Sequence, residues 1–326
     1  MIFLYILILA LGFVGLIKGA DWFVDGAADL AKTFKVPGVI IGLTVVAMGT
    51  SAPELAVSVS AAVRGSNEIA LSNVIGSNLF NLLCVLGVCA VIRTLPVDTR
   101  ILKRDFPIYI LISLLAAACI GGPSVLNGSF LSAAFSDEIG QVSRPVGLIL
   151  FACFICYIVG LIIAAIKNPT QEEETGEIRS IPKCLLLLLI GVALIVGGGQ
   201  AVVRSAEAIA TIVGMSKTLI GLTVVSVGTS LPELVTSIVA AHKGETGMAV
   251  GNVAGSNIFN LMLILGISAA IHPFAANRAC IWDMFILSVI SILTWIFCGV
   301  GKSIKRVEGI LMVAAYIGIM VFAAVR

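Results

Sequence analysis

The sequence predicts an all-α integral membrane protein of ten transmembrane helices, arranged as two inverted five-helix repeats with broken helices at the midplane. Three observations lead to this fold class. The 326-residue chain is 59% hydrophobic and only 12% charged, whereas soluble domains are about 45–50% apolar and about 25% charged. Ten apolar runs are long enough to span a bilayer, which takes about 20 residues. The third observation is a stretch of sequence that occurs twice.

The repeated stretch occupies residues 42–87 and 221–266, and 26 of its 46 positions are identical without a gap, at an offset of 179 residues. The first copy contains GTSAPEL and GSNLFN, and the second contains GTSLPEL and GSNIFN. Five predicted helices per half make the second half enter the membrane from the opposite side. Inverted repeats of this kind are typical of secondary transporters, whose site lies at the midplane between the repeats.

The hydropathic runs give the predicted helices in order. The first repeat, residues 1–166, has helices near 2–31, 37–63, 68–92, 105–121 and 145–166, and the second, residues 182–326, has them near 182–210, 216–241, 247–271, 280–300 and 304–325. The N-terminal run lacks a basic n-region and corresponds to 181–197, so it predicts a retained helix rather than a signal peptide.

Two connections between these helices are conspicuous. Residues 167–181 read KNPTQEEETGEIRSI, which predicts a solvated acidic linker on the cytoplasmic side, in preference to a regulatory calcium site. Residues 121–144 predict a longer outer loop, in which a re-entrant or surface helix stays open.

Orientation follows from Lys and Arg in the short loops. With both termini outside, the outer loops and ends hold six of these residues, and the inner loops hold 13: Lys32, Lys35, Arg93, Arg100, Lys103, Arg104, Lys167, Arg179, Lys183, Lys243, Lys302, Lys305 and Arg306. The excess predicts an inner-membrane, multi-pass protein with external termini.

Several classes of function are disfavoured. A net charge of +2 without a basic run gives no indication of nucleic-acid binding. The eight cysteines fall mostly in apolar spans, so the pair Cys153 and Cys156 predicts packing rather than redox or metal chemistry. An intramembrane hydrolase is disfavoured because both histidines lie at helix ends, away from the serines of the motif. The sequence therefore indicates neither an enzyme nor a bound cofactor, and no obligate protein partner.

The GTSxPE motif has the chemistry of a hard-cation site. Proline removes one backbone donor and opens the helix, and carbonyls freed in this way are tolerated in a membrane only inside protein or beside a polar cavity. Glu54 and Glu233 place a carboxylate next to each proline, at a cost of at least ~2.5–3.5 kcal/mol in the bilayer centre. This cost disfavours a purely structural role. Hydroxyls of the neighbouring Thr and Ser residues add further oxygen ligands.

The GSNxFN motif predicts a second broken helix with a polar lining. Ser77, Asn78 and Asn81 lie within one helical turn, as do their counterparts Ser256, Asn257 and Asn260. Asn78 and Asn257 suit interhelical hydrogen bonding, and the other four suit ion ligation. Two carboxylates balance one Ca²⁺ or two Na⁺. An empty site would carry a charge of −2 in the low-dielectric midplane, so it would change the side that it faces readily when loaded and poorly when empty. That behaviour is typical of an antiporter rather than a channel.

At these residues the sequence resembles the sodium/calcium exchanger family of the calcium/cation antiporter superfamily, in its short prokaryotic form. The resemblance implies alternating access with exchange of about three Na⁺ for one Ca²⁺, and sliding of the first helix of each half against a core. Carried over by position, it implies Ca²⁺ ligation by Glu54, Glu233 and the carbonyls of Thr50 and Thr229. It implies Na⁺ sites that add the carbonyls of Ala47 and Ser226, the hydroxyls of Ser51, Ser77, Ser230 and Ser256, and the amides of Asn81 and Asn260.

One departure bears on the coupling ion. Some relatives, potassium-dependent exchangers among them, carry Asp where this chain has Asn260, which disfavours K⁺ co-transport. Proton-coupled cation exchangers usually have a different, GNA-type motif. Ca²⁺/H⁺ exchange and K⁺-dependent cation/Ca²⁺ exchange remain the alternatives to Na⁺/Ca²⁺ antiport.

Overall fold

The computed structural model describes residues 2–64, 67–167, 179–214 and 226–325. Within these ranges, eight helices are long and apolar enough to span a membrane, or nine if one bent pair counts as a span. The predicted helix 216–241 begins outside the described residues, so the count of ten stays a prediction. The all-helical, membrane-spanning class agrees with the sequence.

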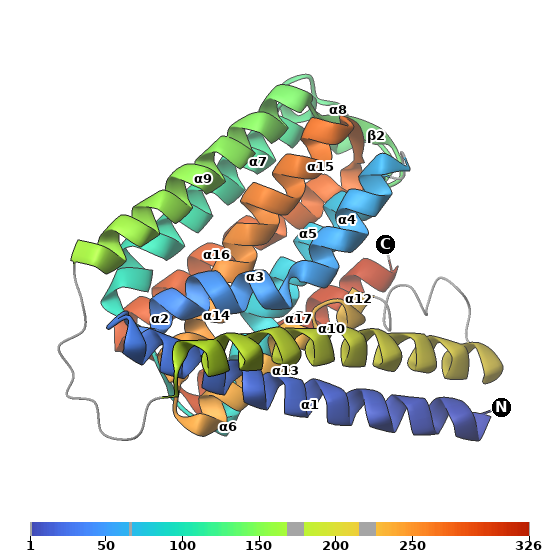
Figure 1. The fold of residues 1–326 in the computed structure, drawn as a ribbon. Coiled ribbons are helices and arrows are strands. Elements are labelled where there is room, and N and C mark those ends of the chain that lie inside the picture. Colours follow the sequence, from blue (N-terminus) through green and yellow to red (C-terminus); the bar gives the residue numbers. More distant parts are fainter. Residues whose placement is uncertain (1, 65–66, 168–178, 215–225, 326) are drawn as a thin grey trace.

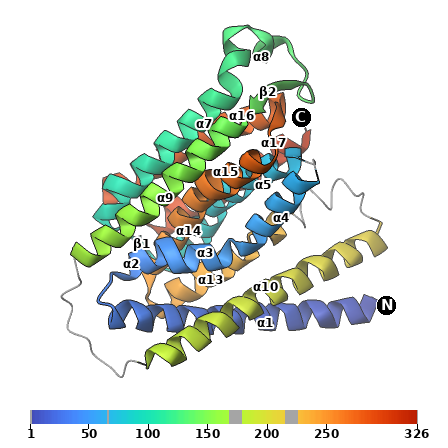
Figure 2. The ribbon, with the colours of Figure 1, turned by 45° about the horizontal axis from the view of Figure 1, so that its top comes forward.

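Two long helices form a pair that lies to one side of the remaining bundle (Figures 1 and 2). They are α1 (Ile2–Thr33) and α10 (Ile181–Ile212). They run antiparallel, because Gly12 faces Gly198 while Gly19 faces Gly191. A Cβ atom on Gly19 would lie 2.8 Å from the Gly191 carbonyl oxygen. The missing side chains therefore allow the two backbones to touch, as in other close helix pairs in membranes.

The next span is broken in its middle, as predicted. One arm consists of α2 (Gly38–Ile41), the π-helical η1 (Gly42–Val46) and α3 (Ala47–Thr50), and the other is α4 (Ala52–Val63). The arms are bent by 50° at Ser51, and a proline occupies the first turn of α4, where a missing N–H costs nothing. In the second half, α12 (Ser226–Gly228) and α13 (Leu231–Lys243) flank the equivalent break.

The prediction of a second break at GSNxFN is wrong. In the first half α5 (Asn67–Leu79), η2 (Phe80–Val85) and α6 (Leu86–Ile92) follow one another without interruption. In the second half α14 (Thr246–Ile258), η5 (Phe259–Ile264) and α15 (Leu265–Ile271) do the same. Glycine and asparagine keep the backbone N–H that proline lacks, so the helix widens into π turns instead of stopping.

Other helices complete the bundle, and short strands tie its ends. The helices are η3 (Ile101–Asp105), α7 (Phe106–Leu126), α9 (Arg144–Lys167), α16 (Arg278–Gly301) and α17 (Arg306–Val325). Strand β1 (Leu95–Pro96) pairs with β4 (Ser303–Ile304), and β2 (Glu138–Val142) pairs with β3 (Phe274–Asn277). Each ribbon thus joins the first half to the second. Residues 121–144 contain the end of α7, the four-residue α8 (Ser129–Ser132) and β2.

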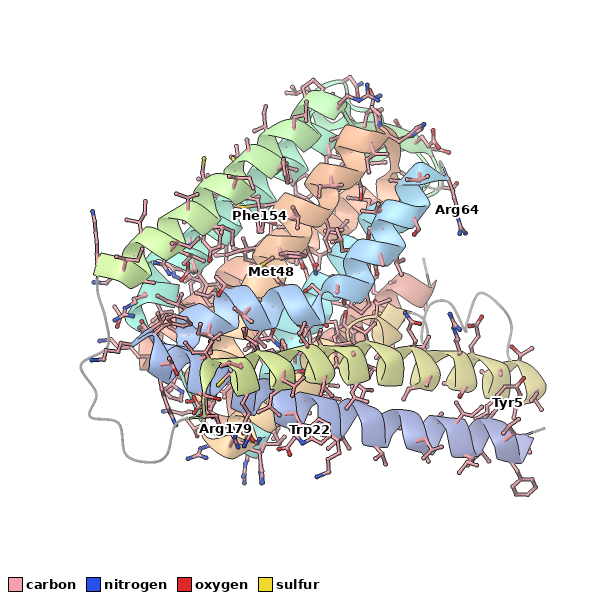
Figure 3. All side chains as sticks on the ribbon, in the orientation of Figure 1. Tyr5, Trp22, Met48, Arg64, Phe154 and Arg179 are labelled. Atoms are coloured by element: carbon pink, nitrogen blue, oxygen red, sulfur yellow. The ribbon has the colours of Figure 1, made fainter. Side chains whose placement is uncertain are left out.

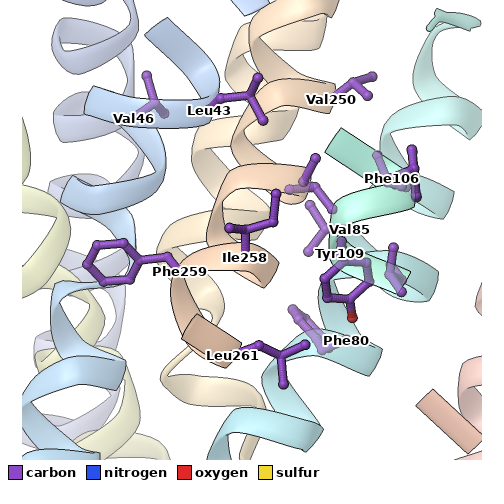
Figure 4. Close-up of a cluster of buried hydrophobic side chains, with 14 of the residues drawn as sticks. Leu43, Val46, Phe80, Val85, Phe106, Tyr109, Val250, Ile258, Phe259 and Leu261 are labelled. Atoms are coloured by element: carbon purple, nitrogen blue, oxygen red, sulfur yellow. The ribbon is translucent and has the colours of Figure 1, made fainter. Parts of the chain in front are cut away.

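The centre of the bundle is the α14–η5 span (Figure 4). Every residue from Met248 to Ile258 is buried. Apolar side chains of α14 and η5 pack with Leu43 and Val46 of η1 and with Val85 of η2. The polar residues of GSNIFN are therefore enclosed by protein, while the outer helices expose large apolar side chains such as Leu4 and Leu189, which suits contact with lipid.

Candidate cation site

The two carboxylates of the GTSxPE motifs lie in the first turns of two helices. Glu54 is 1% exposed at the start of α4, and Glu233 is fully buried at the start of α13. The N-terminus of a helix carries a partial positive charge that stabilises an anion. The proline before each glutamate starts its helix and thereby places the carboxylate at this favourable end.

Hydrogen bonds cross between the two motifs. Ser51 Oγ donates to Glu233 Oε1 at 2.7 Å, and Ser230 Oγ donates to Glu54 Oε1 at 3.1 Å. Each glutamate is thus bound by the serine that stands three residues before the other glutamate. Among the described residues, the second oxygen of each carboxylate has no hydrogen-bond partner. The two carboxylates are therefore linked to both motifs through these serines, and each keeps one oxygen without a partner among the described residues.

The serines of the GSNxFN motifs join the same hydrogen-bond network, Ser256 at a carboxylate and Ser77 at Ser230. Ser77 Oγ lies 3.0 Å from Ser230 Oγ, and Ser256 Oγ donates to Glu233 Oε1 at 3.4 Å. Both serines are almost fully buried. The structure thus brings the predicted ligands of both motif types together.

The four asparagines divide into two roles. Asn78 Nδ2 donates to the Asn257 carbonyl oxygen and Asn257 Nδ2 donates to the Asn78 carbonyl oxygen, both at 3.3 Å. This pair confirms the expected interhelical hydrogen bonding. Asn81 is fully buried, and neither atom of its amide has a partner among the described residues. Asn260 Nδ2 donates to Asn78 Oδ1 at 3.0 Å, which leaves its own Oδ1 unpartnered.

Sequence reasoning missed a second pair of asparagines. Thr50 Oγ1 lies 3.2 Å from Asn252 Oδ1, and Asn252 Nδ2 donates to Ser237 Oγ at 2.9 Å. The same chain of contacts occurs 179 residues away, where Thr229 Oγ1 donates to Asn73 Oδ1 at 3.4 Å and Asn73 Nδ2 donates to Ser58 Oγ at 3.0 Å. The signal was present, because both asparagines lie at identical positions of the repeat. They accept the hydrogens of the threonine hydroxyls and thereby fix the orientation of both hydroxyls beside the site.

The predicted carbonyl of Ala47 is already engaged. Its oxygen accepts a hydrogen bond from the Ser51 amide at 3.0 Å, and Thr50 Oγ1 lies 3.3 Å away. A Na⁺ at this carbonyl would replace the threonine contact, which Asn252 Oδ1 can accept instead. Its counterpart Ser226 begins α12, but the side chain of Ser226 lies outside the described part of the structure.

A cavity of about 250 Å³ approaches the site from one side. Its walls come from α4, α10 and the break before α13, and they include Pro53, Val57, Gln200, Arg204, Thr229 and Pro232. Both motif prolines and one motif threonine thus face the cavity, which therefore ends beside the residues that precede the two glutamates.

Comparisons with known proteins give matches along the whole chain. The sequence model of the sodium/calcium exchanger protein family matches residues 4–163 and 183–325. The chain is 34% identical to the putative antiporter CaxA of Alkalimonas amylolytica over 318 residues, 94% of each chain. It is 31% identical to the sodium/calcium exchanger MaX1 of Methanosarcina acetivorans over 345 residues, 98% of this chain and 99% of MaX1.

A solved structure is similar over the whole length. The sodium-calcium exchanger NCX_Mj, soaked with 2.5 mM Na⁺ and 0.1 mM Ca²⁺, superposes with a TM-score of 0.82 at 32% identity, and the match covers 100% of both chains. Sequence and fold therefore agree across both repeats. The chain belongs to the sodium/calcium exchanger protein family of membrane antiporters.

Proposed function

We propose that the chain is a secondary active antiporter that exchanges Na⁺ for Ca²⁺ by alternating access at one carboxylate-lined site at the membrane midplane. The observation that carries this proposal is the crossed pair of hydrogen bonds between Ser51 and Glu233 and between Ser230 and Glu54. These bonds hold two carboxylates in one buried site that both repeats complete. A single site shared by two ions in turn is what exchange requires.

The number of candidate oxygen ligands suits Ca²⁺, which takes six to eight oxygen ligands. If both carboxylates bind through two oxygens, the carbonyls of Thr50 and Thr229 raise the number of ligands to six. One Ca²⁺ would neutralise the charge of −2. Three Na⁺ would distribute over the carboxylates, the motif serines, the carbonyls of Ala47 and Ser226 and the amides of Asn81 and Asn260, and the loaded site would carry +1. The exchange is then electrogenic.

Reciprocal contacts support the inverted-repeat design of ten helices. The serine–glutamate, threonine–asparagine and asparagine–asparagine contacts each occur twice, with both partners displaced by 179 residues. Such reciprocity is expected of two halves, residues 1–166 and 182–326, related by an axis in the membrane plane. With the Lys and Arg distribution, this design supports the proposal that both termini lie outside and that the linker 167–181, most of which lies outside the described residues, is cytoplasmic.

The test is Ca²⁺ uptake into proteoliposomes that contain the purified chain. Vesicles loaded with Na⁺ and diluted into Na⁺-free buffer with radioactive Ca²⁺ should accumulate Ca²⁺. Vesicles with equal Na⁺ on both sides should not. A pH gradient and a K⁺ gradient, each imposed without a Na⁺ gradient, are the matched comparisons. Uptake that follows either of these and ignores Na⁺ would replace the proposal by one of the two alternative antiporters.

A further inference from the structure

The two sides of the carboxylate site differ in exposure. Val57 is 38% exposed on the cavity side, whereas its counterpart Thr236 is fully buried. Thr229 is half-buried beside the cavity, whereas Thr50 is fully buried. The carboxylates themselves are buried. We call the side towards the C-terminal end of α10, where the cavity lies, the open side, and the side towards the C-terminal end of α1 the closed side.

An ion-pair cluster lies on the closed side. Lys243, at the end of α13, contacts Asp21 Oδ1 at 2.6 Å and Asp25 Oδ1 at 2.5 Å, and it also donates to the Asp21 carbonyl oxygen at 2.9 Å. The two aspartates lie one turn apart on α1. Lys243 thus binds α1 to the helix that carries Glu233.

The open side carries the opposite charge pattern. A shift of 179 residues relates Lys243 to Arg64, Asp25 to Arg204 and Asp21 to Gln200. Gln200 and Arg204 line the cavity on α10, and Arg64 is exposed at the free end of α4 (Figure 3). If this side closed as the other side is closed, Arg64 would approach Arg204. Like charges would then meet where the closed side has an attractive pair.

We infer that Lys243 and Arg204 are positioning residues that bias the site towards the side on which α10 ends, the outer side in the proposed orientation. The inference rests on the proposed alternating access, in which α1 and α10 slide as a pair against the core. Opening the α1 side breaks the contacts of Lys243 with Asp21 and Asp25. Closing the α10 side brings two arginines together. Both effects favour the state in which the site faces the side on which α10 ends.

Arg179 provides a matched control. It contacts Asp29 at 2.7 Å and Asp25 at 3.5 Å, immediately before α10 begins (Figure 3). Both aspartates lie on α1, so Arg179 joins the two sliding helices to each other rather than to the core. Its loss removes a positive charge from Asp25, which Lys243 also contacts, and from Asp29, without releasing α1 from α13.

The experiment measures the accessibility of the cavity. In a chain whose eight native cysteines are replaced, Val57→Cys is labelled with a membrane-impermeant, uncharged maleimide in right-side-out and in inside-out vesicles. We expect Lys243→Gln to slow labelling from the side that reaches Val57→Cys in the parent. The ratio of apparent KM for Ca²⁺ at that face to KM at the opposite face should rise about three- to tenfold, the range expected for losing two partly exposed ion pairs.

Further variants separate the bias from local charge effects. Lys243→Arg should behave as the parent, and Arg179→Gln should leave labelling and the KM ratio unchanged. Arg204→Glu should also slow labelling and raise the KM ratio, because the new carboxylate would attract Arg64 and favour closure of this side. If the carboxylate only attracted Ca²⁺ to the mouth of the cavity, the KM at that face would fall instead. Unchanged labelling in Lys243→Gln, or equal effects of Lys243→Gln and Arg179→Gln, would overturn the inference.

The outcome is distinguishable from a failure of the proposed function. Labelling reports which side is open whether or not Na⁺ drives Ca²⁺ flux. Labelling changes without Na⁺-driven uptake would support the bias and contradict the proposed exchange. Normal Na⁺-driven exchange without any labelling change in the variants would contradict the bias and leave the proposed exchange intact.

Discussion

At the scale of single residues, the carboxylates of Glu54 and Glu233 are positioned by hydrogen bonds that use only one of their two oxygens. Each has one oxygen bound to a serine of the other repeat and one oxygen without a partner among the described residues. Burying a charge without full compensation costs free energy. In the proposed mechanism, a bound cation offsets that cost.

The first prediction concerns these two carboxylates. Glu54→Gln and Glu233→Gln keep the shape of the side chain and the acceptor for the serine but remove the charge that balances Ca²⁺. We expect exchange to fall about 100-fold or more, since unpairing a buried charge costs about 2–5 kcal/mol. In ion-free buffer Tm should not fall, because an uncompensated buried charge is lost, and the rise in Tm on adding Ca²⁺ should disappear.

The control for this prediction is Glu207→Gln on α10, which removes an exposed carboxylate. It should leave both uptake and the Ca²⁺-dependent rise in Tm intact. Full activity of either site variant would place the ion elsewhere.

At the scale of elements, the contact between α1 and α10 depends on glycines at particular positions. Gly19 lies against the backbone of α10, where an added Cβ would come within 2.8 Å of a carbonyl oxygen. Gly15, one turn earlier, has its nearest neighbour at 3.7 Å, an ordinary contact. Two glycines on the same helix thus differ in whether a methyl group fits.

The second prediction follows from this difference. Gly19→Ala should push the helices apart, lower the free energy of unfolding by about 1–3 kcal/mol and slow exchange. Gly15→Ala should change stability by no more than about 0.5 kcal/mol. Thermal unfolding in detergent, together with Na⁺-driven uptake, measures both. Equal effects of the two variants would show that backbone contact at Gly19 is unimportant.

At the scale of the whole molecule, the site charge sets the response to membrane potential. A site of charge −2 that carries three Na⁺ in one direction and one Ca²⁺ in the other moves one net positive charge with the Na⁺. Each charge moved gains or loses about 2.3 kcal/mol per 100 mV. In the proposed exchange of three Na⁺ for one Ca²⁺, the membrane potential would therefore act as a driving force in addition to the ion gradients.

The third prediction is that an inside-positive potential accelerates Ca²⁺ uptake into Na⁺-loaded vesicles and an inside-negative potential slows it. A K⁺ gradient with valinomycin sets the potential in each case, and the same gradient without valinomycin is the control for an effect of K⁺ itself. Uptake that is indifferent to the potential would indicate electroneutral exchange of two Na⁺ for one Ca²⁺.

Much of this molecule is determined by sequence alone, because the responsible properties are local. Apolar length predicts membrane-spanning helices, proline predicts the break at Ser51, and the cost of an intramembrane carboxylate predicts a functional role for Glu54 and Glu233. The repeated motif identifies the family. Each of these conclusions requires only the residue and its neighbours along the chain.

Only the tertiary structure decided which further polar groups are bonded and where the cavity lies. The expected pairing of Asn78 with Asn257 is present, and both amide atoms of Asn81 lack partners among the described residues. The carbonyl of Ala47 accepts a hydrogen bond within its own helix turn, and Asn73 and Asn252 accept the hydrogens of the threonine hydroxyls. The cavity lies beside Arg204, while the equivalent side is held by Lys243. These distinctions depend on contacts between residues up to 222 positions apart, and a sequence pattern carries no distance between such residues.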